Sequence, residues 1–215
     1  MLSIWFTQLE SEPLPSRQYE GYLRELPQEM ADKIRRFRRW QDAHLSLFGK
    51  LLLIHGLQQL NLPPSLLGQM KYSEYQRPEL PLPHLDFNIT HSGPLVACAI
   101  AQDRKIGIDV EDPRSIDFED FRNIWRPDEW AQIMDPDMGK ANFYHLWTCK
   151  EAVIKADGKG MSIPLKDIRI GNKEAWVNEE HWFLKKVRLN DSIPCHLASD
   201  KDFSEDILIR ELSYY

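Results

Sequence analysis

Two carboxylates and a glycine alternate along residues 106–111, in a pattern that could bind a cation. Successive side chains of a β-strand point to opposite faces, so the apolar residues of this segment share one face. Gly107, Asp109 and Glu111 share the other face. Two carboxylates one pleat apart repel each other unless they are solvated or share a cation, and the missing side chain leaves room for a bulky group. The simpler alternative is a solvent-facing strand with two ordinary acids.

A second group of reactive residues lies in segment 142–157, which has the pattern of a helix that ends at Gly158. Residues four apart on a helix share a face, and this spacing aligns Trp147, Glu151 and Lys155. The simplest explanation is a surface Glu–Lys pair, which contributes only ~0.3–0.5 kcal/mol. The chemical interpretation depends on the strand and the helix being brought together.

Together, the strand and the helix supply three carboxylates, Asp109, Glu111 and Glu151. Such oxygen donors suit Mg²⁺, which binds through one or two carboxylates plus substrate phosphates. Lys155 could then meet a phosphate as a point charge, and His91 could donate to another phosphate oxygen.

Further groups suited to a polyanion lie earlier in the chain. Thr90 offers a hydroxyl, and five of the seven residues from 33 to 39 are basic, namely Lys33, Arg35, Arg36, Arg38 and Arg39. Most runs of charge are solvated helix faces, and that alternative stands for this one. With the carboxylates, however, the set suits phosphoryl transfer, in which catalysis is mainly positioning and charge neutralisation.

Hydrophobic spacing and turn residues predict the elements that position these groups. We expect a first strand within 1–10, helices from 28 and over 43–60, and a proline-rich loop over 63–86. Strands over 87–92, 95–101 and 106–111 are joined by short turns, which predicts an antiparallel meander. Helical segments over 118–134 and 142–157 follow, and then short strands at 168–170, 182–184 and 207–209.

Composition and charge restrict the function classes. The chain has 215 residues, 42% of them hydrophobic, which excludes a disordered chain. The net charge of −6 argues against general nucleic-acid binding. The longest apolar run, 95–101, is far shorter than the ~20 residues that a membrane helix needs, and the N-terminus lacks a signal-peptide pattern.

The three cysteines, Cys98, Cys149 and Cys195, are isolated in the sequence. They form no C-x-x-C pair, so we expect neither a disulfide framework nor a structural zinc site. Cys98 lies in the apolar run and is expected to pack as a small core residue. This cysteine usage fits a reducing cytoplasm.

Three segments resemble the ordered motifs of the 4′-phosphopantetheinyl transferases. They are Phe-Asn-Ile-Thr-His-Ser-Gly at 87–93, Gly-Ile-Asp-Val-Glu at 107–111, and Trp-Thr-Cys-Lys-Glu-Ala-Val-Ile-Lys at 147–155. The resemblance is to the long, surfactin-synthetase-type group and extends over about residues 33–165. Either of the last two motifs alone would be weak, but both at this separation are specific.

The resemblance implies an α+β fold, a monomer of two similar halves related by a pseudo-twofold axis. Residues 1–104 would form the half that binds the coenzyme A nucleotide, and 105–215 the half with the magnesium and catalytic motifs. The active site would lie in the cleft between them. The implied reaction moves the 4′-phosphopantetheine group of coenzyme A to a serine of an apo acyl or peptidyl carrier protein. It would require Mg²⁺ or Mn²⁺ and release adenosine 3′,5′-bisphosphate.

The resemblance also implies roles for individual residues. Asp109, Glu111 and Glu151 would hold the metal, Glu151 would act as general base, and Lys155 would stabilise phosphate charge or protonate the leaving group. The residues that would contact coenzyme A are Lys33, Ser46, Arg77, Thr90, His91 and Lys155.

The chain departs from the family pattern on the coenzyme side. Gln76 replaces the usual glycine before Arg77, which predicts a less tight loop, and Arg77 replaces a lysine. Met30 and Leu45 stand where some relatives carry basic residues, so we expect Arg36 or Arg39 to supply charge there.

Two alternative functions remain open at this point. A magnesium-dependent nuclease or phosphohydrolase could use the same carboxylates, although the acidic net charge counts against it. A catalytically silent module that binds carrier proteins is also possible, although the intact acids and Lys155 count against that. For carrier docking, segment 118–134 offers Trp125 and Trp130, unless both tryptophans belong to the core.

Overall fold

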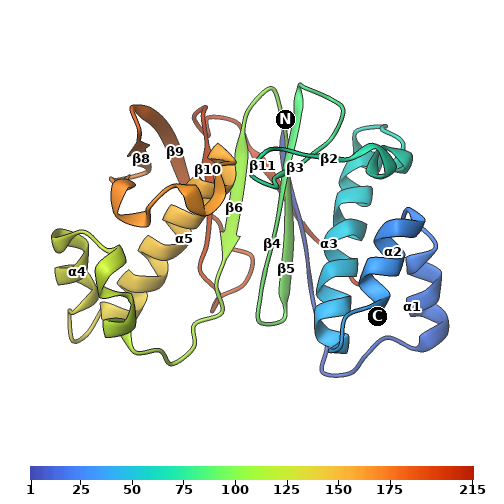
Figure 1. Cartoon of the computed structure of the whole chain (residues 1–215), viewed down its shortest axis with the longest axis horizontal. Coiled ribbons are helices and arrows are strands. Elements are labelled where there is room, and N and C mark those ends of the chain that lie inside the picture. Colours follow the sequence, from blue (N-terminus) through green and yellow to red (C-terminus); the bar gives the residue numbers. More distant parts are fainter.

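Two β-sheets lie side by side at the centre of the molecule, with one long helix on each outer side (Figure 1). The computed structural model describes all residues, 1–215. The first sheet has the strand order β11-β1-β5-β4, and its strands are β1 (Leu2–Gln8), β4 (Leu85–Ser92), β5 (Leu95–Gln102) and β11 (Ile207–Glu211). The second has the order β6-β10-β9-β8-β7, and its strands are β6 (Ile106–Val110), β7 (Arg169–Ile170), β8 (Glu174–Val177), β9 (Glu180–Lys186) and β10 (Cys195–Ser199).

The helices flank these sheets. On the side of the first sheet lie α1 (Ser16–Leu23), α2 (Gln28–Arg35) and the long α3 (Trp40–Gln59). On the side of the second sheet lie α4 (Pro127–Ile133) and the long α5 (Gly139–Asp157). Short 3₁₀-helices complete the set: η1 (Pro64–Gln69), η2 (Phe118–Ile124), η3 (Gly160–Ser162) and η4 (Leu165–Asp167). No helix combines the length and apolar character that a membrane span requires.

Three of the four hydrophobic cores pack the sheets and the long helices together. Helix α3 packs on the first sheet through residues such as Phe48, Leu52 and Ile100. A second core lies between the two sheets and includes Ile4 and Ala97 of the first with Ile106, Ile108 and Val110 of the second. The third lies between α5 and the second sheet and includes Ala152, Val153 and Trp182. The apolar face predicted for segment 106–111 is therefore confirmed as a core face.

The predicted antiparallel meander is wrong at its third strand. Strand β6 pairs antiparallel with β10, in the register Asp109↔His196, and has no ladder with β5. Its free edge instead meets side chains of β4. Four short polar residues at alternate positions of β4 accept hydrogen bonds from backbone N–H groups at 106, 108, 110 and 112; they are Asp86, Asn88, Thr90 and Ser92. Alternate residues of β4 share one face, so these four side chains all point at the edge of β6. Where the two sheets meet, side-chain hydrogen bonds thus take the place of backbone pairing.

Other differences from the expected elements are smaller. Residues 63–86 are not a continuous loop, since they contain η1 and a hairpin of β2 (Lys71–Tyr72) and β3 (Pro78–Glu79). The first part of segment 118–134, as far as Ile124, is a 3₁₀-helix, and Trp125 is extended before α4 begins. Strands β8 and β10 were not predicted. The last strand, β11, runs parallel to β1 and so returns the end of the chain to the first sheet.

Candidate active site

Lys155, Asp109 and Thr90 meet where the two sheets join, although they come from α5, β6 and β4. The Lys155 Nζ lies 2.5 Å from Asp109 Oδ1 and donates to Thr90 Oγ1 at 3.0 Å. The Thr90 hydroxyl in turn donates to Asp109 Oδ1 at 3.3 Å. Thr90 belongs to motif 87–93, Asp109 to motif 107–111 and Lys155 to motif 147–155. The fold therefore brings the three motifs together.

Asp109 is buried, with one oxygen satisfied and one not. Its Oδ2 is fully enclosed and has no hydrogen-bond partner. Burial raises the pKa of Asp109 to about 7, against the opposing effect of Lys155, and Glu111 and Glu151 raise it further. A buried carboxylate oxygen without a partner is costly. A cation bound at Oδ2 would remove that cost.

Glu151 and Glu111 lie close enough to Asp109 to affect its titration. Glu151 is half-buried, its carboxylate makes no hydrogen bond, and burial raises its pKa, with Glu111 adding to the effect. Glu111 accepts a 2.8 Å hydrogen bond from Ser92. As oxygen donors, the three carboxylates fit Mg²⁺.

A group of basic side chains borders this triangle on the side of the first sheet. His91 is exposed, and its pKa is lowered by partial burial and by the charges of Lys155 and Lys50. Lys50 lies on α3, one helical turn after Ser46, and its pKa is lowered by burial and by Lys33. Lys50 is thus close enough to Lys33 and His91 to interact with both electrostatically, and it shares a helix face with Ser46.

Lys50 was missed by the sequence reasoning. It lies in an apolar helical run, where a single lysine looks like an ordinary surface residue. The available signal was its i, i+4 spacing from Ser46, which places both on one helix face. In the structure, no carboxylate forms an ion pair with it, so its charge is available to an anion.

Arg77 lies at the joint between the sheets, and its guanidinium is largely used by the protein itself. It pairs with Asp86 at 2.8 Å and donates to the carbonyl oxygens of Lys155 at 3.0 Å and Ile106 at 3.0 Å. These contacts use three of the five N–H donors that an arginine offers. Arg77 therefore connects α5 and β6 to β4 through hydrogen bonds. Only the two N–H groups not used in these contacts can donate to a ligand.

The loop before Arg77 is tight, although a less tight one was expected. Gln76 has a φ of 64°, in the left-handed region that glycine adopts most easily. The turn closes through the Gln76 N–H on the Ser73 carbonyl at 3.0 Å and the Ser73 N–H on the Arg77 carbonyl at 2.9 Å. Gln76 thus adopts a left-handed backbone conformation without being a glycine.

Comparison with known proteins assigns the family. The 4′-phosphopantetheinyl transferase superfamily model matches residues 105–202, and the model of the N-terminal part of 4′-phosphopantetheinyl transferases matches residues 12–103. The 4′-phosphopantetheinyl transferase Sfp of Bacillus subtilis is 35% identical over 207 residues, which cover 91% of this chain and 92% of that protein. The chain belongs to the 4′-phosphopantetheinyl transferases.

Other relatives agree with this assignment. The 4′-phosphopantetheinyl transferase ffp of Bacillus subtilis is 31% identical over 91% of this chain and 92% of its own length. The 4′-phosphopantetheinyl transferase gsp of Aneurinibacillus migulanus is 36% identical over 65% of this chain and 59% of its own. The resemblance to the surfactin-type transferases is thereby confirmed.

One charged residue of this transferase's third motif faces away from the site. Lys150 is completely buried, with its Nζ 2.6 Å from Glu129 Oε2 and 2.9 Å from the Leu165 carbonyl oxygen. Burial lowers its pKa, and Glu129 opposes that effect. The Lys150 ammonium also lies 5.2 Å from the ring of Trp125, which is only 5% exposed. Lys150 thus fixes α4 to α5, and the core alternative for Trp125 is confirmed.

Proposed function

We propose that this protein transfers the 4′-phosphopantetheine group of coenzyme A to a serine of an apo acyl or peptidyl carrier protein and releases adenosine 3′,5′-bisphosphate. The convergence of Lys155, Asp109 and Thr90, with Glu151 on the same helix as Lys155, carries the proposal. Family membership supports phosphopantetheine transfer as the activity. The chemistry of the site supports the roles proposed below for individual residues.

Asp109, Glu111 and Glu151 would hold Mg²⁺ or Mn²⁺, because they are oxygen donors and Asp109 Oδ2 is buried without a partner. When bound, the metal supplies positive charge that neutralises the pyrophosphate of coenzyme A. Lys155 adds a fixed positive charge on the phosphate being transferred. His91 and Thr90 offer donors to the coenzyme phosphates, and Lys33, Ser46 and Lys50 form the basic side that would receive the 3′-phosphate.

Glu151 would remove the proton from the carrier serine, directly or through one water. Its raised pKa suits this role, since a general base works best when its pKa lies nearer the working pH. The serine oxygen forms a bond to the phosphorus next to the pantetheine arm. The bond from that phosphorus to the bridging oxygen breaks, and the electron pair leaves with adenosine 3′,5′-bisphosphate. Lys155 would stabilise that departing oxygen.

The two sheet-and-helix units would correspond to halves related by a pseudo-twofold axis, 1–104 and 105–215, with coenzyme A in the cleft between them. Strand β11 is the one part of the second half that lies in the first sheet. For carrier docking, Met134 and Met138 are 50% and 55% exposed, whereas Trp125 is core and Trp130 is half-buried. We place the enzyme in the cytoplasm and expect it to act as a monomer.

The decisive experiment is intact-mass spectrometry of an apo carrier protein incubated with the enzyme, coenzyme A and Mg²⁺. We expect a metal-dependent gain of one phosphopantetheine. Glu151→Gln should abolish this gain with the fold intact, whereas the exposed control Glu12→Gln should not change it.

The outcomes separate the proposal from its alternatives. Wild-type turnover by Glu151→Gln would overturn the base and ligand assignment. Hydrolysis of coenzyme A without carrier modification would favour a phosphohydrolase. Carrier binding without any transfer, unaffected by Glu151→Gln, would favour a silent binding module.

A further inference from the structure

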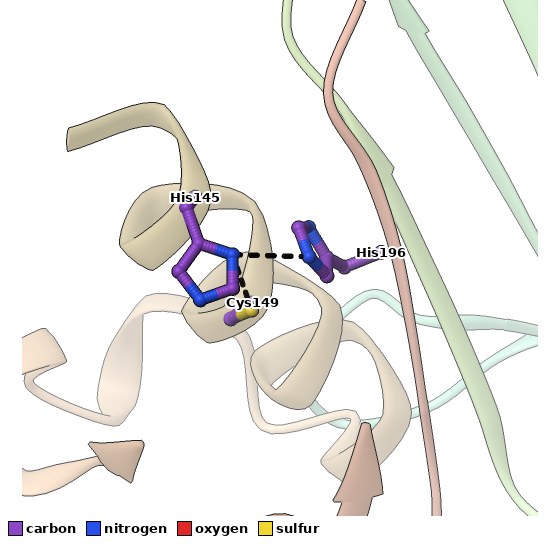
Figure 2. Close-up of side chains that lie close together, drawn as sticks. All are labelled: His145, Cys149 and His196. Atoms are coloured by element: carbon purple, nitrogen blue, oxygen red, sulfur yellow. Dashed lines mark hydrogen bonds between the residues drawn. The ribbon is translucent and has the colours of Figure 1, made fainter. Parts of the chain in front are cut away.

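Three side chains with metal-ligating atoms, other than the three carboxylates, gather between α5 and strand β10 of the second sheet. His145 and Cys149 lie four residues apart on one face of α5, and His196 lies on β10 and faces them (Figure 2). One ligand atom from each of the three lies within 4.8 Å of the others, and this is the only such set of His, Cys, Asp or Glu in the structure. No role in phosphopantetheine transfer has been given to any of them.

The distances within the cluster fit a shared cation. His145 Nδ1 lies 3.1 Å from His196 Nε2 and 3.8 Å from Cys149 Sγ. Typical Zn–N distances of about 2.0–2.1 Å and a Zn–S distance of about 2.3 Å place tetrahedral ligand atoms roughly 3.3–3.6 Å apart. Both distances from His145 lie within a few tenths of an ångström of these values, and the remaining pair, Cys149 Sγ and His196 Nε2, lies within 4.8 Å and closes further when the two side chains share one ion.

A neighbouring hydroxyl fixes the orientation of His196. Thr148 Oγ1 lies 2.7 Å from His196 Nδ1, and its single proton is donated to the Tyr144 carbonyl oxygen at 2.7 Å. The hydroxyl oxygen must then accept from the His196 Nδ1–H, which leaves the lone pair of Nε2 directed at His145 and the cluster. Metal-binding histidines commonly have such a partner on the second ring nitrogen.

The surroundings keep the two imidazoles neutral, as metal binding requires. Burial lowers the pKa of His196 to about 3, with His145 and Lys186 contributing, and burial and Lys186 also lower the pKa of His145. Lys186 and Asp109 are the residues paired with His196 on the two neighbouring strands.

The cluster is accessible from solvent. The His145 side chain is exposed, and a cavity of about 720 Å³ is lined by both histidines. A cation can therefore approach the two histidines from the cavity, with the buried Cys149 behind them, and a water molecule can complete the coordination from the cavity side.

We propose that His145, Cys149 and His196 form a binding site for a borderline-soft divalent cation of the Zn²⁺ type. Imidazole and thiolate ligands favour such ions over Mg²⁺, which prefers oxygen. Binding releases the thiol proton of Cys149 to solvent and moves the proton of His145 from Nδ1 to Nε2. The site uses none of the three carboxylates, although Asp109 is the neighbour of His196 across the ladder, and the proposal does not depend on the proposed transferase activity.

Cobalt titration tests the site without any activity measurement. Co²⁺ replaces Zn²⁺ in such sites, and its bond to a thiolate gives a near-ultraviolet charge-transfer band that a carboxylate site cannot give. We expect this band to saturate at one equivalent of Co²⁺, to disappear on addition of Zn²⁺, and to persist in excess Mg²⁺. The band should also remain in the Glu151→Gln variant.

Matched variants assign the band to the three residues. Cys149→Ser should remove it, whereas Cys195→Ser, which changes a buried free cysteine next to His196 in sequence, should retain it. His145→Ala changes an exposed side chain and is expected to weaken Co²⁺ binding by at least about tenfold to a hundredfold, the scale of losing even an outer-shell partner. The isosteric Thr148→Val should weaken it by about tenfold or more, because Val cannot fix the ring of His196.

Circular dichroism of the metal-free variants checks that each one folds. A wild-type protein without a thiolate band, or a band that survives in Cys149→Ser or His145→Ala, would overturn the proposal. A loss of transferase activity with the band intact would leave the metal site standing and refute only the proposed function.

Discussion

Gly107 of β6 lies directly beneath the backbone of Ala152 in α5. A Cβ at position 107 would overlap the Ala152 carbonyl oxygen and lie 2.5 Å from the Ala156 backbone nitrogen. The absence of a side chain lets the helix rest on the strand. This close approach sets the distance between Glu151 and Lys155 on the helix and Asp109 on the strand.

Gly107→Ala should therefore damage both stability and activity. Backbone atoms cannot move aside as a flexible side chain can, so we expect a loss of about 1–3 kcal/mol in the free energy of unfolding. Transfer activity should fall more than stability explains, because α5 must shift relative to Asp109. Urea unfolding and carrier mass spectrometry measure the two effects. Gly21→Ala is the matched control, since a Cβ there meets nothing within 4 Å, and an unchanged Gly107→Ala enzyme would contradict the argument.

Lys50 should contribute to coenzyme A binding and not to the chemical step. Burial and Lys33 lower its pKa, so an anion that neutralises this pair should bind there. Lys50→Gln is expected to raise the KM for coenzyme A by about tenfold, the scale of one hydrogen bond to a charged group, with little change in kcat.

Dephospho-coenzyme A, which lacks the 3′-phosphate, makes the Lys50 test specific. Wild type and Lys50→Gln should show similar KM values for this substrate, and the exposed control Lys166→Gln should behave as wild type with both. An equal loss with both substrates would place Lys50 away from the 3′-phosphate.

Local periodicity predicted the parts of the site that lie within one element. The alternation of Gly107, Asp109 and Glu111, and the four-residue spacing of Glu151 and Lys155, follow from strand and helix geometry alone. Such patterns depend on neighbours a few residues away, which the sequence displays directly.

Contacts between distant segments could not be predicted in this way. Nothing near Asp109 in the sequence indicates that β6 pairs with β10 and not with β5, because strand pairing depends on packing across the whole domain. The cluster of His196 with Cys149 is a consequence of the same pairing. The isolated cysteines therefore gave no metal pattern, although one of them lies beside two histidines.

Gln76 carries a conformational cost that glycine would remove. Its φ of 64° costs an L-residue roughly 1–2 kcal/mol, partly offset by the greater freedom of glycine in the unfolded chain. Gln76→Gly should raise the free energy of unfolding by about 0.5–1 kcal/mol. Gln76→Ala removes the same side chain but keeps the Cβ, so it should bring no such gain. Equal effects of both variants in urea unfolding would show that the side chain, not the backbone, matters.

His196 should make the metal-free protein sensitive to acid. Burial holds its pKa at about 3, below the value of 6.5 expected for an unfolded chain, and Lys186 and His145 add to the effect. The Thr148 hydroxyl also contacts the ring, and Asp109 is the residue opposite His196 in the ladder. Between these two pKa values the unfolded state binds a proton that the folded state does not. Stability from this residue is therefore complete above about pH 6.5 and is lost as the pH falls.

His196→Asn removes this titration while keeping an N–H group that can donate to Thr148. From pH 7.5 to pH 5, the wild type should lose about 2 kcal/mol more of its free energy of unfolding than the variant, since a shift of one pKa unit corresponds to about 1.36 kcal/mol. Urea unfolding over this pH range in the presence of a chelator measures the difference. The control His181→Asn changes an exposed histidine of β9 and should keep the wild-type slope. If His196→Asn also kept that slope, the ring would be accepting a proton in the folded state, and burial would not be what keeps it neutral.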